Sequence, residues 1–146
     1  HGSLCEELFS AAKSEFRHLE SFYFHNCIYD HVWRDNARRR SERVPTLELL
    51  RTYGPDWRLI VVGDAAMSPY ELVEQGGSVE YTNDETGLAW LVRVFEHFRH
   101  RVWWNPEPER TWEYTRSTQL IASVLEPRMF PLTLDGLARW IDALRK

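Results

Sequence analysis

Long apolar runs, excess positive charge and an N-terminal leader are missing from this sequence. No apolar stretch approaches the roughly 20 residues that span a bilayer as a helix. The formal net charge of −4 gives no electrostatic reason to expect binding to nucleic acid. The polar N-terminus has no apolar core of a signal peptide. We therefore expect a cytoplasmic protein with neither a membrane nor a nucleic-acid partner.

Cysteine is scarce as well. The chain has only Cys5 and Cys27, and they do not form a Cys-x-x-Cys pair. This spacing favours two buried thiols in a reducing compartment over a disulfide or a zinc site. The expected cytoplasmic location rests partly on this observation.

Several catalytic and nucleotide-binding motifs are also missing. There is no Gly-x-Gly-x-x-Gly and no Gly-x-x-x-x-Gly-Lys-Ser/Thr, so a nucleotide phosphate cradle is unsupported. The Gly-x-Ser-x-Gly elbow of α/β-hydrolases is missing too.

What the chain does contain is typical of one globular domain. It has 146 residues, of which 43% are apolar and 27% charged, enough to bury a core. Residues 1–3, His-Gly-Ser, resemble a cloning remnant, so the predicted domain spans residues 4–146.

The most informative stretch is 58–69, in which an apolar run ends at Gly63 and Asp64. Such a run is typical of a strand buried on both faces of a parallel sheet. Ligands of open α/β sheets bind outside the carboxyl ends of the strands, so Asp64 is placed to hold a cation or a polar ligand. The alternative is that Asp64 only caps the following turn.

Strand and helix patterns alternate along the rest of the chain. We predict helices at 4–20, 47–53, 87–99, 111–125 and 134–145, with Thr46 and Thr133 as N-caps. Strands are predicted at 22–33, 58–63, 101–104 and 129–132, the first with a bend or hairpin at 25–27. A short helix-like stretch, 70–73, lies in a long connection. This order predicts a doubly wound α/β fold with a mostly parallel sheet flanked by helices, and with Asp64, Asn105 and Thr133 along one edge.

Five stretches carry a resemblance to a known family. They are FYFHNCIYD (22–30), RVPT (43–46), VVGDAAMSPYEL (61–72), WNPEP (104–108) and MFPLTLDGL (129–137). In this order they resemble the von Willebrand factor A (VWA) domain proteins of the CoxE-like group, over essentially all of residues 4–146.

The resemblance implies a Rossmann-like sheet with a metal-ion-dependent adhesion site at its carboxyl edge. That site uses an Asp-x-Ser-x-Ser loop after the first strand, a Thr from a second loop and an Asp from a third. Thr46 stands in the position of the Thr, and Asp64 in that of the last Asp. Hard oxygen ligands of this kind suit Mg²⁺ or Mn²⁺, and a carboxylate of the partner protein would complete the shell.

The chain departs from the family pattern at its beginning. The first strand and the Asp-x-Ser-x-Ser loop are missing, and the sequence starts at what should be the first helix. The resemblance therefore implies either an N-terminally truncated domain or a gap filled by a strand from a second copy, which would make a homo-oligomer by strand exchange.

Three functions compete at this point. The resemblance favours a non-enzymatic protein-binding module that acts with a MoxR-type AAA+ ATPase and a client protein in protein or metalloenzyme maturation. One alternative is a metal-dependent hydrolase that uses Asp64 with Glu107 or Glu109. The other is a metal-free scaffold that binds through Trp103, Trp104 and the 65–86 connection.

Overall fold

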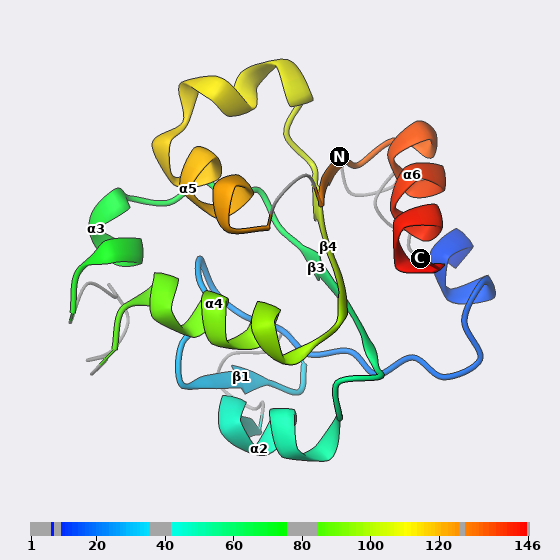
Figure 1. Ribbon diagram of the computed structural model, residues 1–146, viewed down its shortest axis with the longest axis horizontal. Helices are drawn as coiled ribbons and strands as arrows, with labels where there is room; N and C mark the ends of the chain where they lie inside the picture. Colours follow the sequence, from blue (N-terminus) through cyan, green and yellow to red (C-terminus); the bar gives the residue numbers. More distant parts are fainter. Residues whose placement is uncertain (1–6, 8–9, 36–41, 76–84, 126–127, 146) are drawn as a thin grey trace.

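The fold is built around a short parallel sheet (Figure 1). The computed structural model describes residues 7, 10–35, 42–75, 85–125 and 128–145. Three strands pair in the order β3 (Arg58–Val62), β4 (His100–Asn105) and β5 (Met129–Pro131), with β4 in the middle. Both pairings are parallel, with Val61 opposite Trp103 and Trp104 opposite Phe130. The predicted α/β class is confirmed at this level: a three-stranded parallel sheet flanked by helices.

Helices cover both faces of the sheet because the apolar side chains of β4 alternate between them. Trp103 belongs to a cluster with helices α4 (Gly87–His97) and α5 (Arg116–Leu125). Val102 and Trp104 belong to a second cluster with helix α6 (Leu134–Arg145). Successive residues of a strand point to opposite faces, so the two clusters lie on opposite sides of the sheet, with α4 and α5 on one side and α6 on the other (Figure 1).

A second, smaller sheet lies beside the first. Strands β1 (His31–Trp33) and β2 (Arg43–Pro45) pair antiparallel, and helix α2 (Thr46–Thr52) follows β2 directly. The sequence pattern does not predict β2. Of the predicted strand 22–33, only β1 forms regular structure, with isolated bridges at Tyr23 and between His25 and Cys27. The predicted bend in its middle is confirmed, since Asn26 has a φ of 61°.

Strand β3 matches the predicted position but not the predicted burial. Only Val61 of the strand is buried, and Arg58 is exposed. The reason is that β3 pairs with β4 alone and so forms an edge of the sheet. The apolar run predicts a strand buried on both faces, and only Val61 meets that expectation.

Several predicted helix boundaries and faces are wrong. Of the 4–20 helix, residues 10–14 are helical but 15–20 are not, while residues 4–6, 8 and 9 lie outside the described residues. The 111–125 helix is interrupted at Thr115, so it becomes a 3₁₀ helix (Glu109–Tyr114) followed by α5. In the predicted 134–145 helix, the apolar Leu134 is 73% exposed, and the large buried side chains of α6 are those of Leu137, Trp140 and Leu144.

The two predicted N-caps have different outcomes. Thr133 caps α6 as predicted, with its Oγ1 accepting a hydrogen bond from the Gly136 amide at 2.9 Å. Thr46 is instead the first helical residue of α2, after Pro45 as the N-cap, and no side-chain cap forms there. The short helix α3 (Pro69–Val73) confirms the helix-like stretch predicted after Asp64. None of the described helices is long and apolar enough to cross a membrane.

Candidate functional site

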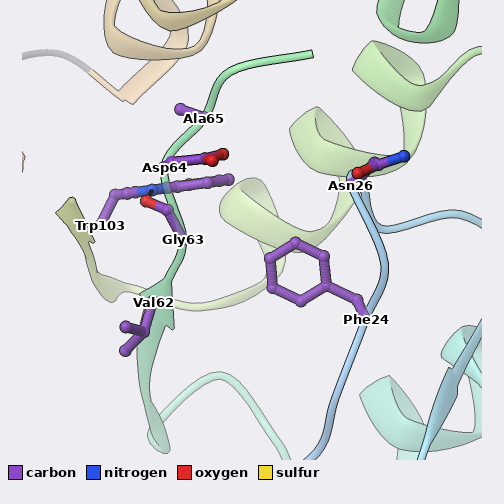
Figure 2. A pocket seen from close by; sticks show the side chains of 7 residues that line it. All are labelled: Phe24, Asn26, Val62, Gly63, Asp64, Ala65 and Trp103. Atoms are coloured by element: carbon purple, nitrogen blue, oxygen red, sulfur yellow. Dashed lines mark hydrogen bonds between the residues drawn. The ribbon is translucent and has the colours of Figure 1, made fainter. Parts of the chain in front are cut away.

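A small pocket opens at the carboxyl end of β3 (Figure 2). Its volume is about 270 Å³. The lining comes from the end of β3, the loop that follows, the segment before β1, and β4: Phe24, Asn26, Val62, Gly63, Asp64, Ala65 and Trp103. The pocket therefore lies where an open α/β sheet places its ligands.

Asp64 is the charged residue of this pocket, and its side chain is exposed. Its Oδ1 accepts a hydrogen bond from the Ala66 amide at 3.0 Å, which is the turn-capping role expected of Asp after a strand. No described residue donates a hydrogen bond to the second carboxylate oxygen. The two predicted roles of Asp64 are thus compatible, because one oxygen fixes the turn and the other is available to a ligand.

The loop that carries Asp64 is anchored to α5. Ala65 is 2% exposed and has a left-handed φ of 58°. Its carbonyl oxygen accepts hydrogen bonds from Ser117 Oγ at 2.7 Å and Thr118 Oγ1 at 3.2 Å. The Met67 amide donates in turn to Ser117 Oγ at 3.0 Å. A backbone conformation this unusual for a non-glycine residue persists only where its surroundings hold it, so these bonds set the position of Asp64.

Asn26 forms the opposite wall of the pocket. Figure 2 shows the Asp64 carboxylate and the Asn26 carboxamide oxygen facing each other across it. The Asn26 Nδ2 donates to Glu71 Oε1 at 3.2 Å, and Glu71 Oε2 accepts from the Ser68 amide at 3.3 Å. Glu71 is only 6% exposed, so this buried carboxylate ties the Asn26 segment to the loop after Asp64.

Sequence reasoning did not identify Asn26 and Glu71 as site residues. One signal was present: Asn tolerates the left-handed backbone better than most residues, and Asn26 stands at the predicted bend. The link to Glu71 spans 45 positions, and no local pattern reveals it.

Trp103 forms the base of the pocket rather than an exposed anchor. Its indole Nε1 donates to the Gly63 carbonyl oxygen at 2.8 Å. Trp103 and Trp104 are 0% and 1% exposed. The prediction that they bind a partner is therefore wrong, because both belong to the core.

Thr46, the second predicted metal residue, is not among the residues that line the Asp64 pocket. It is 2% exposed, and its Oγ1 donates to the Tyr29 carbonyl oxygen at 2.7 Å. It lines a separate groove along β3 instead. Asn105 is fully buried and Thr133 caps α6, so Asp64 is the only one of the three predicted strand-end residues that reaches this pocket.

The donor set of the pocket fits a largely hydrated Mg²⁺ or Mn²⁺. It offers one carboxylate oxygen from Asp64 and one amide oxygen from Asn26, both hard donors. Within the described part of the chain, no three His, Cys, Asp or Glu residues gather into a metal-binding group. A cation here would keep several waters or take further ligands from a binding partner.

The carboxylates of the hydrolase alternative lie elsewhere. Glu109 is 3.6 Å from Arg139 on α6. The Glu107 amide donates to Asn105 Oδ1 at 2.9 Å, and neither glutamate lines the Asp64 pocket. The described site therefore contains no second carboxylate beside Asp64.

A comparison of the chain with protein-family models, with characterised proteins and with solved structures finds no match to any of them.

Proposed function

We propose that this protein is a non-enzymatic binding module with a Rossmann-like, VWA-like sheet, which holds Mg²⁺ or Mn²⁺ at Asp64 and engages a protein partner there. The observation that carries the proposal is the Asp64 carboxylate, presented at the carboxyl end of a parallel strand by a loop that α5 holds in place. The resemblance to CoxE-like proteins supports a MoxR-type AAA+ ATPase and a client protein as partners.

The chemistry of the pocket explains why metal and partner would bind together. Asp64 supplies one negative charge, and Asn26 supplies a neutral oxygen across the pocket. A divalent cation held by so few protein oxygens retains open positions. A carboxylate from a partner can occupy one of them, so that the cation bridges the two proteins. Asp64 and Asn26 orient the cation, and the anchored loop keeps it at the surface.

Paramagnetic broadening by Mn²⁺ tests the site directly. In nuclear magnetic resonance spectra, submillimolar Mn²⁺ should broaden the amide signals of Asn26, Gly63, Asp64 and Ala65 first. Thermal melts should show a parallel rise in Tm, because a ligand at 100 times its Kd adds roughly 2.7 kcal/mol to the free energy of unfolding.

Asp64→Ala should abolish both effects. The matched control is Asp56→Ala, since the Asp56 side chain is 89% exposed and does not line the pocket. Broadening that persists in Asp64→Ala, or that is lost equally in Asp56→Ala, would contradict a cation site at Asp64. The affinity of an identified ATPase partner for this protein should also fall in Asp64→Ala and on chelation of the metal.

A further inference from the structure

Glu71 is a buried carboxylate that contacts the Asp64 pocket without lining it. It is 6% exposed and is not among the pocket residues. Two hydrogen bonds fix its main chain: its amide donates to the Ser68 carbonyl oxygen at 3.0 Å, and its carbonyl oxygen accepts from Tyr29 Oη at 2.8 Å. A charge is tolerated in such a place only where hydrogen bonds satisfy it, so the partners of its two carboxylate oxygens matter.

One carboxylate oxygen of Glu71 has a local role. Ser68 stands directly before the short helix α3, and Glu71 Oε2 accepts from the Ser68 amide at 3.3 Å. This is the glutamate half of a Ser-x-x-Glu capping box, in which the Glu side chain reaches back to the amide of the residue that begins the helix. A main-chain amide is only a donor, so Oε2 has to act as an acceptor.

The other carboxylate oxygen, Oε1, accepts from Asn26 Nδ2 at 3.2 Å. A carboxamide carries donors on one side and an acceptor on the other, so this bond decides which group Asn26 presents to the pocket. With its N–H₂ group on Glu71, Asn26 turns its oxygen towards Asp64 (Figure 2). The opposite orientation would set two oxygens against each other at Glu71 and would present the N–H₂ group to the pocket.

Asp64 and Glu71 are thus two carboxylates that could attract the same amide group. Asp64 is exposed, so water can serve its second oxygen, whereas the buried Glu71 depends on donors from the protein. A buried charged acceptor that loses its donor costs more free energy than an exposed one. The N–H₂ group of Asn26 is therefore held at Glu71, and the pocket keeps an oxygen.

We propose that Glu71 is the positioning residue that sets the polarity of the pocket. It acts through Asn26, because a carboxylate that accepts at both oxygens obliges Asn26 to turn its own oxygen to Asp64. A cation then meets two hard oxygen donors; an inverted Asn26 would offer it Asp64 and a repelling N–H₂ group. This inference rests on the proposed cation site and explains how a residue outside the pocket determines its ligand class.

Glu71→Gln tests the role with almost no change in shape. The new side chain offers one acceptor and one donor group. Since the Ser68 amide cannot turn, the acceptor should stay with it and the donor should face Asn26, which then turns over. The Kd for Mn²⁺ should rise at least about tenfold, the usual scale for losing an outer-shell partner of a metal ligand.

Glu74→Gln is the matched control. Glu74 is exposed and does not line the pocket, so this variant loses the same charge but should leave the Kd for Mn²⁺ unchanged.

A second substitution should rescue the site. In N26D/E71Q, the new carboxylate at position 26 accepts from the new amide at position 71 with one oxygen and presents the other to Asp64. Asp also tolerates the left-handed backbone at position 26. Mn²⁺ should therefore bind N26D/E71Q at least as tightly as the wild type. N26D alone sets two carboxylates against each other and should bind Mn²⁺ more weakly than N26D/E71Q.

A measurement without metal reads the orientation of Asn26 itself. In spectra of the metal-free wild type, nuclear Overhauser effects from the Asn26 side-chain amide protons should reach Glu71 and Ser68. In Glu71→Gln they should move to Gly63 and Asp64. A variant that merely loosens the fold would weaken these effects without redirecting them, and the wild-type spectra remain decisive if Glu71→Gln does not fold.

Three outcomes would overturn this role of Glu71. They are effects from the wild-type Asn26 amide protons to Asp64, an unchanged Kd for Mn²⁺ in folded Glu71→Gln, and equal Mn²⁺ binding by N26D and N26D/E71Q. Failure of Mn²⁺ to bind the wild type would instead overturn the proposed cation site, and the metal-free spectra would still decide whether Glu71 orients Asn26.

Discussion

At the scale of single residues, Cys27 shows how the fold sets chemical reactivity. It is 2% exposed and is the free cysteine of the described chain. Burial raises the pKa of its thiol from 9.0 to about 12, and the nearby Glu71 carboxylate acts in the same direction. A thiol reacts as the thiolate, so Cys27 is inert at neutral pH, in agreement with the predicted buried thiol.

The pKa of Cys27 predicts how stability changes in alkali. Above pH 9 the thiol ionises in the unfolded chain but not in the folded one, so the free energy of unfolding falls as the pH rises towards 12. The thiol contributes a loss of about 1.4 kcal/mol between pH 8 and pH 10. Urea unfolding of the protein and of Cys27→Ala at each pH isolates this contribution, and identical pH dependence in both would contradict it.

Asn26 combines a backbone role with a side-chain role, and substitutions separate the two. Asn26→Gly keeps the left-handed backbone but removes the amide, whereas Asn26→Ala loses both. Asn26→Ala should therefore be the less stable variant, by about 1 kcal/mol. Both variants should weaken Mn²⁺ broadening at Asp64. Equal melting temperatures would contradict this prediction, because they would show that the left-handed backbone at position 26 does not favour Gly over Ala.

At the scale of elements, the sequence pattern predicts where strands lie better than it predicts how they are paired and buried. Strands β3, β4 and β5 lie within a residue or so of their predicted ranges, because continuous apolar runs give a strong local signal. Strand β2 has three residues and was missed. Its burial depends on pairing with β1, which the local sequence does not encode.

The candidate site is likewise predicted only in part from the sequence. Asp64 was predicted from its place after a strand, and it does line a pocket. Asn26, which faces it, comes from a segment nearly forty positions away, and Thr46 was placed at the site by resemblance alone. Which strand ends meet at one edge depends on sheet order, and the order β3-β4-β5 leaves the place beside β3 open.

The contact between α5 and the Asp64 loop gives a prediction at this scale. Ser117→Ala removes hydrogen bonds to Ala65 and Met67 and leaves a buried carbonyl with only the longer bond from Thr118. The free energy of unfolding should fall by about 1–3 kcal/mol. Ser123→Ala is the control on the same helix, because the exposed Ser123 hydroxyl bonds only within the helix. If Ser123→Ala lowered the free energy of unfolding by a similar amount, the contact of Ser117 with the Asp64 loop would not be the cause of the loss.

At the scale of the whole molecule, the described residues form two separate sheets. β4 lies at the centre, paired on both sides, with core clusters on both of its faces. β1 and β2 have three residues each and pair only with each other in their sheet. Stability within a protein varies with burial and pairing, so these two regions should open at different free energies.

Native-state hydrogen exchange should resolve the two regions. The amides of Val102, Trp103 and Trp104 should exchange only by global unfolding, with opening free energies equal to that from urea denaturation. Those of Val32 and Val44 should exchange through a smaller opening with little dependence on urea, because it exposes less surface. Equal protection of both sheets would contradict this difference, because the two sheets would then unfold as one unit.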